Sequence, residues 1–357
     1  MLRAALSRWL LPRLAGPGGI VVDAIDLFDW QRGERGLGPI KLATPVPDAF
    51  ACRLHPDDPE LEDLRRRYAS FDARATTPLL WRPGTVSSAD MRSFRGENAY
   101  VWQRLGPLRS VNAYALAAYH LLSLGCPGIG QPEGTTGPAS LRGRDRFARL
   151  DEDGAFGAVV YEIAGRRVSR DLLDSIAELD FIERYLGLGS GGVSRILDIG
   201  AGYGRLAHRA LAAFPEIEHY ICADAVAEST YLCELYLRYR GLGEKALVAP
   251  LDRIHAALAD RSVDLAVNIH SFSECRPEAV EWWLSLLASH GVRNLMIAPN
   301  AMDHGGRELL TNDRRPFGPL IERHGYRPVA RVPKYRDPVV QRYGLSPTMY
   351  HLFELAA

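Results

Sequence analysis

The sequence has few lysines and few cysteines, and it has no long apolar run. Lysine occurs only three times among the 43 basic residues, at Lys41, Lys245 and Lys334. The 43 basic residues are balanced by 43 acidic ones, so the chain has no net charge to attract nucleic acid. No apolar stretch approaches the roughly 18–20 residues that span a bilayer. We therefore expect neither a nucleic-acid partner nor a membrane span.

The five cysteines are scattered, odd in number and without a C-x-x-C pair. Such usage is typical of reduced thiols in a cytosolic protein and does not indicate a thiolate metal site. Residues 1–13 are amphipathic, but arginines interrupt the apolar core that a signal peptide requires. We therefore expect a cytoplasmic location and interpret residues 1–13 as a short surface helix.

The most informative segment is an apolar, strand-like run that ends in alternating glycines. It reads RILDIGAGYGR, with Asp198 followed by Gly200, Gly202 and Gly204. Glycine takes a positive φ at little cost and lets a ligand lie against bare backbone. A second acid, Asp224, ends the next apolar run, 20 residues beyond Gly204. The pattern predicts a nucleoside-binding loop, with Asp224 placed to hold a ribose diol.

Spacing separates this loop from two other glycine-rich loops. A dinucleotide fingerprint, G-x-G-x-x-G, needs a third glycine where this chain has Arg205. A phosphate-binding P-loop needs a G-K-[ST] ending, and no lysine follows here. The remaining pattern, D-x-G-x-G-x-G, resembles motif I of the class I S-adenosylmethionine-dependent methyltransferases.

That resemblance implies S-adenosylmethionine as the cofactor. It implies that Asp198 organises the loop around the methionine part of the cofactor and that Asp224 takes the ribose hydroxyls. The predicted cofactor-binding residues are Asp198, Gly200, Ala201, Gly202, Gly204, Asp224, Ala225 and Asn268.

The C-terminal half alternates strand-like and helix-like segments, which predicts a mostly parallel sheet. Helices are expected at 169–186 with Ser169 as N-cap, 205–214, 228–239, 277–289 and 319–324. Strands are expected at 193–199, 220–223, 246–249, 263–269, 294–298, 327–332 and 349–355. The predicted fold class is α/β, a Rossmann-like seven-stranded sheet with helices on both faces and the last strand inserted antiparallel, as in class I methyltransferases.

We expect two domains from the length of 357 residues. Residues 166–357 would form the methyltransferase domain. Residues 1–165, rich in arginine, proline and glycine, would form a mainly helical or irregular accessory region that serves as an acceptor lid or a homodimer contact.

Ligands of open α/β sheets bind at the carboxyl ends of the strands. After the fourth expected strand the chain places Asn268, His270, Ser271 and Glu274 within seven residues. Such a cluster of polar side chains at a strand end is typical of a catalytic site.

Three segments resemble a family of sugar O-methyltransferases found with antibiotic-glycoside and surface-polysaccharide biosynthesis. They are Tyr203-Gly-Arg after the glycines, Asp224 with the aromatic helix at 231–237, and N-x-x-S-F-x-E at 268–274; a weaker likeness covers 94–103. The resemblance implies methyl transfer to a sugar hydroxyl of a glycosylated natural product, a nucleotide sugar or a polysaccharide precursor. Cys275 departs from the family pattern and puts the acceptor in doubt.

Transfer to a hydroxyl needs alignment of the reactants and a general base. His270 and Glu274 are the catalytic candidates, with Glu274 either the base or the partner that orients His270. The alternatives are a histidine that only hydrogen-bonds at a strand end and an acid that only stabilises a helix start. The predicted acceptor-binding residues are Tyr100, Tyr203, Ser271, Asn300 and His304.

Three alternatives stay open. Some sugar O-methyltransferases use a divalent cation, but only Asp303 with Asp252 suggests one here, and we predict no metal. The acceptor could be a non-sugar phenol, amine or carboxylate. The chain could also be a noncatalytic assembly protein that keeps the cofactor fold, which the intact glycine loop with Asp224 argues against.

Overall fold

The fold was analysed in a computed structural model of the chain. It describes residues 42, 44–76, 91–96, 146–147, 149–158, 160–163, 166–189, 191–259, 261–300, 305–334 and 348–356. The chain forms two compact units. One comprises Met1–Val46, Ser93–Arg184 and Lys334–Pro347, and the other comprises Pro47–Arg92, Tyr185–Pro333 and Thr348–Ala357.

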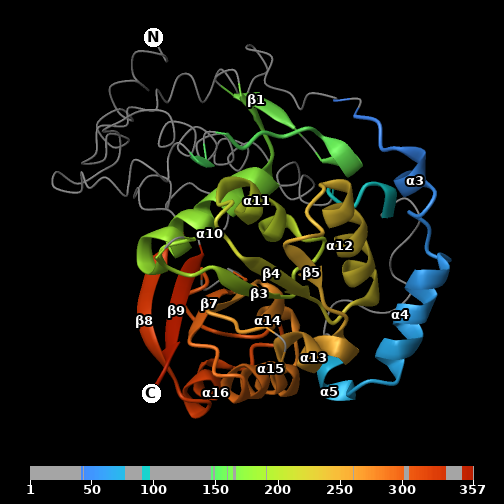
Figure 1. Ribbon diagram of the computed structural model, residues 1–357. Coiled ribbons are helices and arrows are strands. Elements are labelled where there is room, and N and C mark those ends of the chain that lie inside the picture. Colours follow the sequence, from blue (N-terminus) through green and yellow to red (C-terminus); the bar gives the residue numbers. More distant parts are fainter. Residues whose placement is uncertain are drawn as a thin grey trace, which may run out of the picture. The chain divides into compact units, whose positions relative to one another are not determined.

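A seven-stranded sheet organises the second unit (Figure 1). Its order is β5-β4-β3-β6-β7-β9-β8. The strands are β3 (Arg195–Ile199), β4 (His219–Ala223), β5 (Ala246–Val248), β6 (Leu265–Ile269), β7 (Asn294–Ala298), β8 (Tyr326–Pro333) and β9 (Met349–Leu355).

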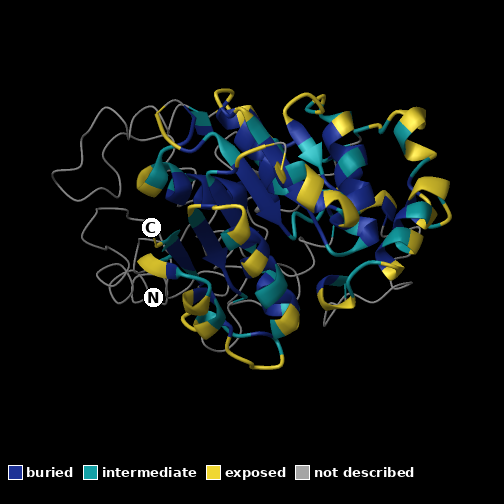
Figure 2. Ribbon diagram, turned by 60° about the horizontal axis from the view of Figure 1, so that its bottom comes forward, coloured by how far each residue is buried: buried dark blue, intermediate teal, exposed yellow. Residues whose placement is uncertain are grey.

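The first five strands are parallel to one another, and β9 lies antiparallel between β7 and β8. Most residues of β3, β4, β6 and β7 are buried, as is typical of parallel strands covered on both faces. Figure 2 shows these strands as the dark, buried centre of the sheet. This order and the inserted antiparallel strand confirm the predicted class I methyltransferase fold.

Helices cover both faces of the sheet because the crossovers run in opposite directions from its middle. The connection from β3 to β4 contains α11 (Arg205–Ala213), and that from β6 to β7 contains α15 (Pro277–Ser289). Two right-handed crossovers that run in opposite directions across a sheet place their helices on its opposite faces. Figure 1 shows α11 on one face of the sheet and α15 on the other. The other helices of this part are α12 (Ala227–Tyr239), α13 (Ile254–Ala259), α14 (Ser271–Glu274) and α16 (Gly318–Arg323).

The boundaries expected for the helices and strands between residues 169 and 355 agree with the observed ones to within two residues, and the helix expected at 1–13 lies outside the described residues. The predicted N-cap is also confirmed, because the Ser169 hydroxyl accepts a hydrogen bond from the Leu172 N–H at 3.2 Å at the start of α10 (Arg170–Leu186). The short helix α14 was not expected, since its residues were interpreted as a loop.

The other unit contains a small hairpin of β1 (Tyr161–Ile163) and β2 (Arg166–Val168) and most of α10. A buried ion pair joins Arg95 to Glu152 at 2.6 Å, and the same carboxylate accepts the hydroxyl of Ser169. Both charged side chains are fully buried, so each depends on the other to offset the cost of its desolvation.

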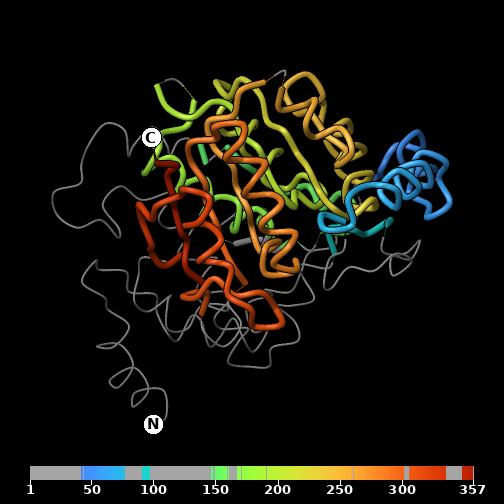
Figure 3. The backbone as a smooth tube through the Cα atoms, turned by 90° about the horizontal axis from the view of Figure 1, so that it is seen from below, coloured from blue at the N-terminus to red at the C-terminus, as the bar shows by residue number. Residues whose placement is uncertain are grey.

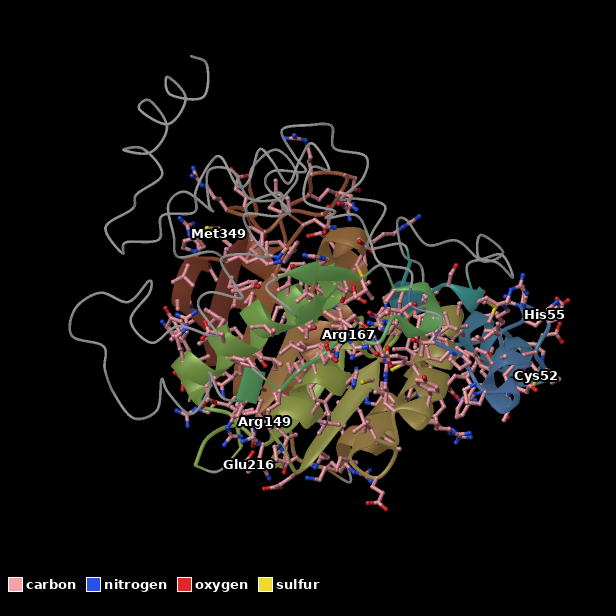
Figure 4. The ribbon with its side chains drawn as sticks, turned by 90° about the horizontal axis from the view of Figure 1, so that it is seen from above. Cys52, His55, Arg149, Arg167, Glu216 and Met349 are labelled. Atoms are coloured by element: carbon pink, nitrogen blue, oxygen red, sulfur yellow. The ribbon has the colours of Figure 1, made fainter. Side chains whose placement is uncertain are left out.

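A segment upstream of the expected methyltransferase domain packs within the sheet-containing unit. It contains α3 (Asp48–Ala51), α4 (Pro59–Ala69) and α5 (Ala73–Thr76). Helix α4 lies beside α12, and α5 contacts α15, as Figures 1 and 3 show. The labelled side chains of Cys52 and His55 lie at the outer margin of this segment (Figure 4), and both residues are exposed. The division of function at residue 165 stays a prediction.

No helix in the described part of the chain is long and apolar enough to cross a membrane.

Candidate functional site

The glycine loop follows β3 and is held against the end of β4. The N–H groups of Gly200 and Ala201 both donate to the carbonyl oxygen of Ala223, at 2.8 and 3.2 Å. Gly204 donates to the carbonyl of Ala201 at 3.0 Å, which closes the turn that starts α11. The loop therefore has a fixed shape before any ligand binds.

All three alternating glycines have positive φ, at 75°, 56° and 82°, but each position needs glycine for a different reason. A Cβ on Gly200 would lie 2.2 Å from Cβ of Ser271, so this glycine lets the loops after β3 and β6 touch. A Cβ on Gly204 would lie 2.9 Å from Sγ of Cys233 on α12. A Cβ on Gly202 would meet nothing within 4 Å. Open space beside bare backbone is thus found at Gly202.

Asp224 follows β4 and is bonded to the same glycine. One carboxylate oxygen accepts the N–H of Gly202 at 3.0 Å, and the other accepts the N–H of Val226 at 2.8 Å. Burial raises the pKa of Asp224 to about 6; the two backbone bonds oppose the rise, and the negative charge of Glu274 adds to it. The glycine loop and Asp224, which were both expected to bind the cofactor, are therefore in direct contact.

Asp198 lies within β3 and is buried, and its carboxylate accepts the hydroxyl of Tyr220 at 3.1 Å. Ala225 is half-buried in the turn after Asp224. Tyr203 packs edge to face against Tyr236 of α12, with ring centroids 5.1 Å apart. Cofactor contact by Asp198 and Ala225 and acceptor contact by Tyr203 stay predictions.

Asn268 joins the ends of two strands. Its amide nitrogen donates to the carbonyl of Ile199 at 2.9 Å, and its amide oxygen accepts the N–H of Phe272 at 2.9 Å. The side chain is completely buried. Asn268 thus ties the β3 and β6 loops together and starts α14, and a direct cofactor contact by this residue stays a prediction.

His270 has an unusual backbone conformation between β6 and α14. Its φ is 68° and its ψ is −30°, whereas few residues other than glycine take a positive φ. Its N–H donates to the carbonyl of Ala298 at 2.7 Å, which anchors the turn to the end of β7. Backbone strain of this kind costs on the order of 1–3 kcal/mol and clusters at functional sites.

Glu274 lies at the end of α14, on the same rim as Asp224. Its charge raises the pKa of Asp224, so the two carboxylates lie close enough to interact. The side-chain amide of Asn300, after β7, donates to Glu274 at 3.4 Å. The Asn300 N–H donates to the hydroxyl of buried Ser273 at 3.1 Å. The fold therefore brings together the predicted base and one predicted acceptor residue.

Two predicted acceptor residues, Tyr100 and His304, lie outside the described residues. Asp303, one of the two carboxylates considered for a cation, also lies outside them, and Asp252 is held by Arg67 at 2.7 Å. Within the described ranges no group of three or more His, Cys, Asp or Glu side chains could hold a metal ion.

Cys275, the departure from the family pattern, follows Glu274 and is buried. Burial raises the pKa of its thiol to about 12, so the thiol stays protonated at neutral pH. A buried, protonated thiol is a poor nucleophile.

Tyr68 is not among the residues predicted from the sequence. This residue of α4 reaches the site from far upstream, and its hydroxyl donates to the main-chain carbonyl of Asp224 at 3.1 Å. The Asp58-Pro59-Glu60 start and the spacing of Leu61, Leu64 and Tyr68 are helix signals that could have revealed α4. Nothing in the sequence indicates which surface α4 covers.

Comparison with known proteins finds no matching family model and no matching curated protein. The solved structures similar to this chain include methyltransferases. Magnesium protoporphyrin IX methyltransferase from Synechocystis is 12% identical, with TM-score 0.35, covering 70% of this chain and 97% of that one. Mitomycin 7-O-methyltransferase is 18% identical, with TM-score 0.34, covering 46% and 49% of the two chains.

A third similar structure is Sp1610 from Streptococcus pneumoniae, at 19% identity and TM-score 0.36, covering 50% of this chain and 69% of that one. All three TM-scores lie below 0.5. The fold assignment therefore rests on the strand order described above and not on these likenesses.

Proposed function

We propose that this protein is an S-adenosylmethionine-dependent methyltransferase. The observation that carries the proposal is the glycine loop after β3: the N–H of Gly202 is bonded to the Asp224 carboxylate, and the space that a Cβ on Gly202 would occupy is open. This arrangement lies at the carboxyl ends of neighbouring strands at the centre of the sheet, where open α/β sheets bind ligands. A buried carboxylate beside exposed backbone fits the ribose and the methionine part of that cofactor.

The acceptor we propose is a sugar hydroxyl. When bound, S-adenosylmethionine supplies a sulfonium methyl group that a hydroxyl oxygen attacks in line: the O–C bond forms as the C–S bond breaks. Glu274 or His270 takes the hydroxyl proton, and a positioned base contributes about 10²- to 10⁴-fold to such a step. Asn300 orients the Glu274 carboxylate through its amide.

The cofactor proposal is tested by calorimetric titration of the folded chain with S-adenosylmethionine. We expect binding by the native chain and its loss in Asp224→Ala. A folded native chain that binds no S-adenosylmethionine would contradict the proposal and favour a noncatalytic role.

The acceptor proposal is tested by mass spectrometry, with glycosides, phenols and amines offered in parallel. We expect a gain of one methyl group on a glycoside. Methylation of phenols or amines alone would keep the enzyme and overturn the sugar acceptor.

The base is tested with Glu274→Gln and His270→Ala on the acceptor so found. We expect at least one variant to lose about 10²-fold or more in turnover while S-adenosylmethionine still binds. Full turnover in both variants would show that neither side chain is the base.

A further inference from the structure

Tyr68 lies where the loops after two neighbouring strands meet. Its side chain is buried, and its hydroxyl is within hydrogen-bond distance of three groups. These are the Asp224 carbonyl oxygen at 3.1 Å, the Thr230 hydroxyl at 2.8 Å and the Leu251 N–H at 2.9 Å. Asp224 follows β4, Thr230 belongs to α12, and Leu251 follows β5.

The hydrogen-bonding capacity of the phenol is completely used by these partners. A tyrosine hydroxyl has one proton to donate and accepts with its oxygen. The oxygen accepts from the Leu251 N–H, and the proton goes to the Asp224 carbonyl or to the Thr230 hydroxyl, which itself donates to the Asp224 carbonyl at 3.3 Å. In both arrangements the Tyr68 hydroxyl holds that carbonyl, directly or through Thr230. Burial raises the pKa of Tyr68 to about 12, so the donated proton stays in place at neutral pH.

The bonded carbonyl belongs to the same residue as the carboxylate that faces the glycine loop. Fixing the Asp224 carbonyl fixes the backbone from which that carboxylate projects. The carboxylate in turn accepts the N–H of Gly202, beside the open space of the site. A shift of the Tyr68 hydroxyl would therefore move the main chain of Asp224 and, with it, the carboxylate of the same residue.

Helix α4 is held on the same elements by two ion pairs. Arg65 contacts Glu228 of α12 at 2.8 Å, and Arg67 contacts Asp252, beside Leu251, at 2.7 Å. Glu228 is buried, with 7% of its side chain exposed. These contacts hold Tyr68 in register with the ends of β4 and β5.

We propose that Tyr68 is a positioning residue for cofactor binding, which rests on the proposed function above. Helix α4 is then part of the S-adenosylmethionine site, although it lies more than 100 residues upstream of the glycine loop. Tyr68 holds the main chain of Asp224 so that its carboxylate is aimed at the ribose hydroxyls.

The test compares Tyr68→Phe with Tyr326→Phe. Tyr326 is also buried and donates its hydroxyl proton to a main-chain carbonyl, that of Val292 at 2.6 Å, away from the glycine loop. Both variants keep the ring; Tyr68→Phe loses the bonds to its three partners, and Tyr326→Phe loses the single bond to Val292. We expect Tyr68→Phe to raise the Kd for S-adenosylmethionine about 5- to 30-fold, whereas Tyr326→Phe lowers the Tm and leaves the Kd unchanged.

The outcomes separate the two proposals. Native chain that binds no S-adenosylmethionine would overturn the proposed function and this inference together. Native binding with equal Kd values for Tyr68→Phe and Tyr326→Phe would overturn the inference alone. Should Tyr68→Phe fail to fold, Thr230→Val removes the hydroxyl that bonds both Tyr68 and the Asp224 carbonyl. An unchanged Kd in that variant would overturn the inference that the Tyr68–Thr230 hydroxyl pair holds Asp224.

Discussion

At the scale of single residues, the charge of Asp224 decides what the site can hold. An ionised carboxylate is a pure acceptor that can bond both hydroxyls of a ribose diol, whereas a protonated carboxyl group has one oxygen turned into a donor. Because burial raises its pKa to about 6, Asp224 is largely ionised at pH 7 and half protonated near pH 6. Protonation removes acceptor capacity and also weakens the bond from Gly202.

We predict that the affinity for S-adenosylmethionine falls in acid. With a folded pKa of about 6, the ionised fraction drops roughly tenfold for each pH unit below it, and the Kd should rise in proportion. Calorimetric titrations between pH 5 and pH 8 measure this. Asp224→Asn should bind weakly at every pH and lack the dependence, and a native Kd that is equal at pH 5 and pH 7 would contradict the prediction.

At Gly202, the effect of a side chain on cofactor binding can be separated from the strain of a positive φ. We predict that Gly202→Ala abolishes or strongly weakens S-adenosylmethionine binding, because the added Cβ would enter the open space beside Asp224. The matched control is Gly291→Ala, which has a similar φ of 63° and equally open surroundings at the end of α15.

Both alanine variants should lose about 1–2 kcal/mol of unfolding free energy, the cost of a left-handed residue with a Cβ. Thermal unfolding measures that common loss, and calorimetry measures the affinity. Equal Kd values for the two variants would remove Gly202 from the site.

At the scale of elements, the sequence predicts the sheet well because local signals coincide. The buried apolar runs of β3 and β4 end at Gly200 and Asp224, and Pro277 begins its helix where expected. The contacts between elements have no such local signal. The bond from Gly202 to Asp224 and the double role of Asn268 depend on how the β3, β4 and β6 loops meet.

Helix α4 shows the limit of that reasoning. Its buried residues repeat at helical spacing, but an amphipathic face shows only that something covers it. Its partner α12 begins more than 150 residues later in the chain. Tyr68 could therefore not be assigned to the site from the sequence.

We predict that the packing of α4 on α12 is stabilised by Arg65 and not by its neighbour Arg66. Arg65→Ala leaves the buried Glu228 carboxylate without this partner and should lower the unfolding free energy by about 1–3 kcal/mol. Arg66 pairs with Asp63 on the exposed side of α4, so Arg66→Ala should change it by less than about 0.5 kcal/mol. Denaturant unfolding measures both, and equal losses would contradict the prediction.

At the scale of the whole molecule, the two compact units interleave along the chain. The chain passes from one unit to the other after residues 46, 92, 184, 333 and 347. A single cut in the chain therefore does not separate these compact units.

We predict that residues 166–357 alone do not form a stable cofactor-binding domain. This shortened chain retains all seven strands but lacks α4 and α5, so it exposes the faces of α12 and α15 that these helices contact. Expression, circular dichroism and calorimetry compare it with the full chain. A soluble, folded fragment with native affinity would contradict both this prediction and the role of Tyr68.

The place of β9 has a consequence for how the protein is made. β9 is synthesised after β3 to β8, yet it lies between β7 and β8 and is the strand with which β8 pairs in the sheet. Until residues 349–355 have left the ribosome, β7 presents an unpaired edge, and such edges invite aggregation. The β7 edge is therefore open from the synthesis of β7 until that of β9, and the pairing of β9 covers it and provides the edge on which β8 pairs.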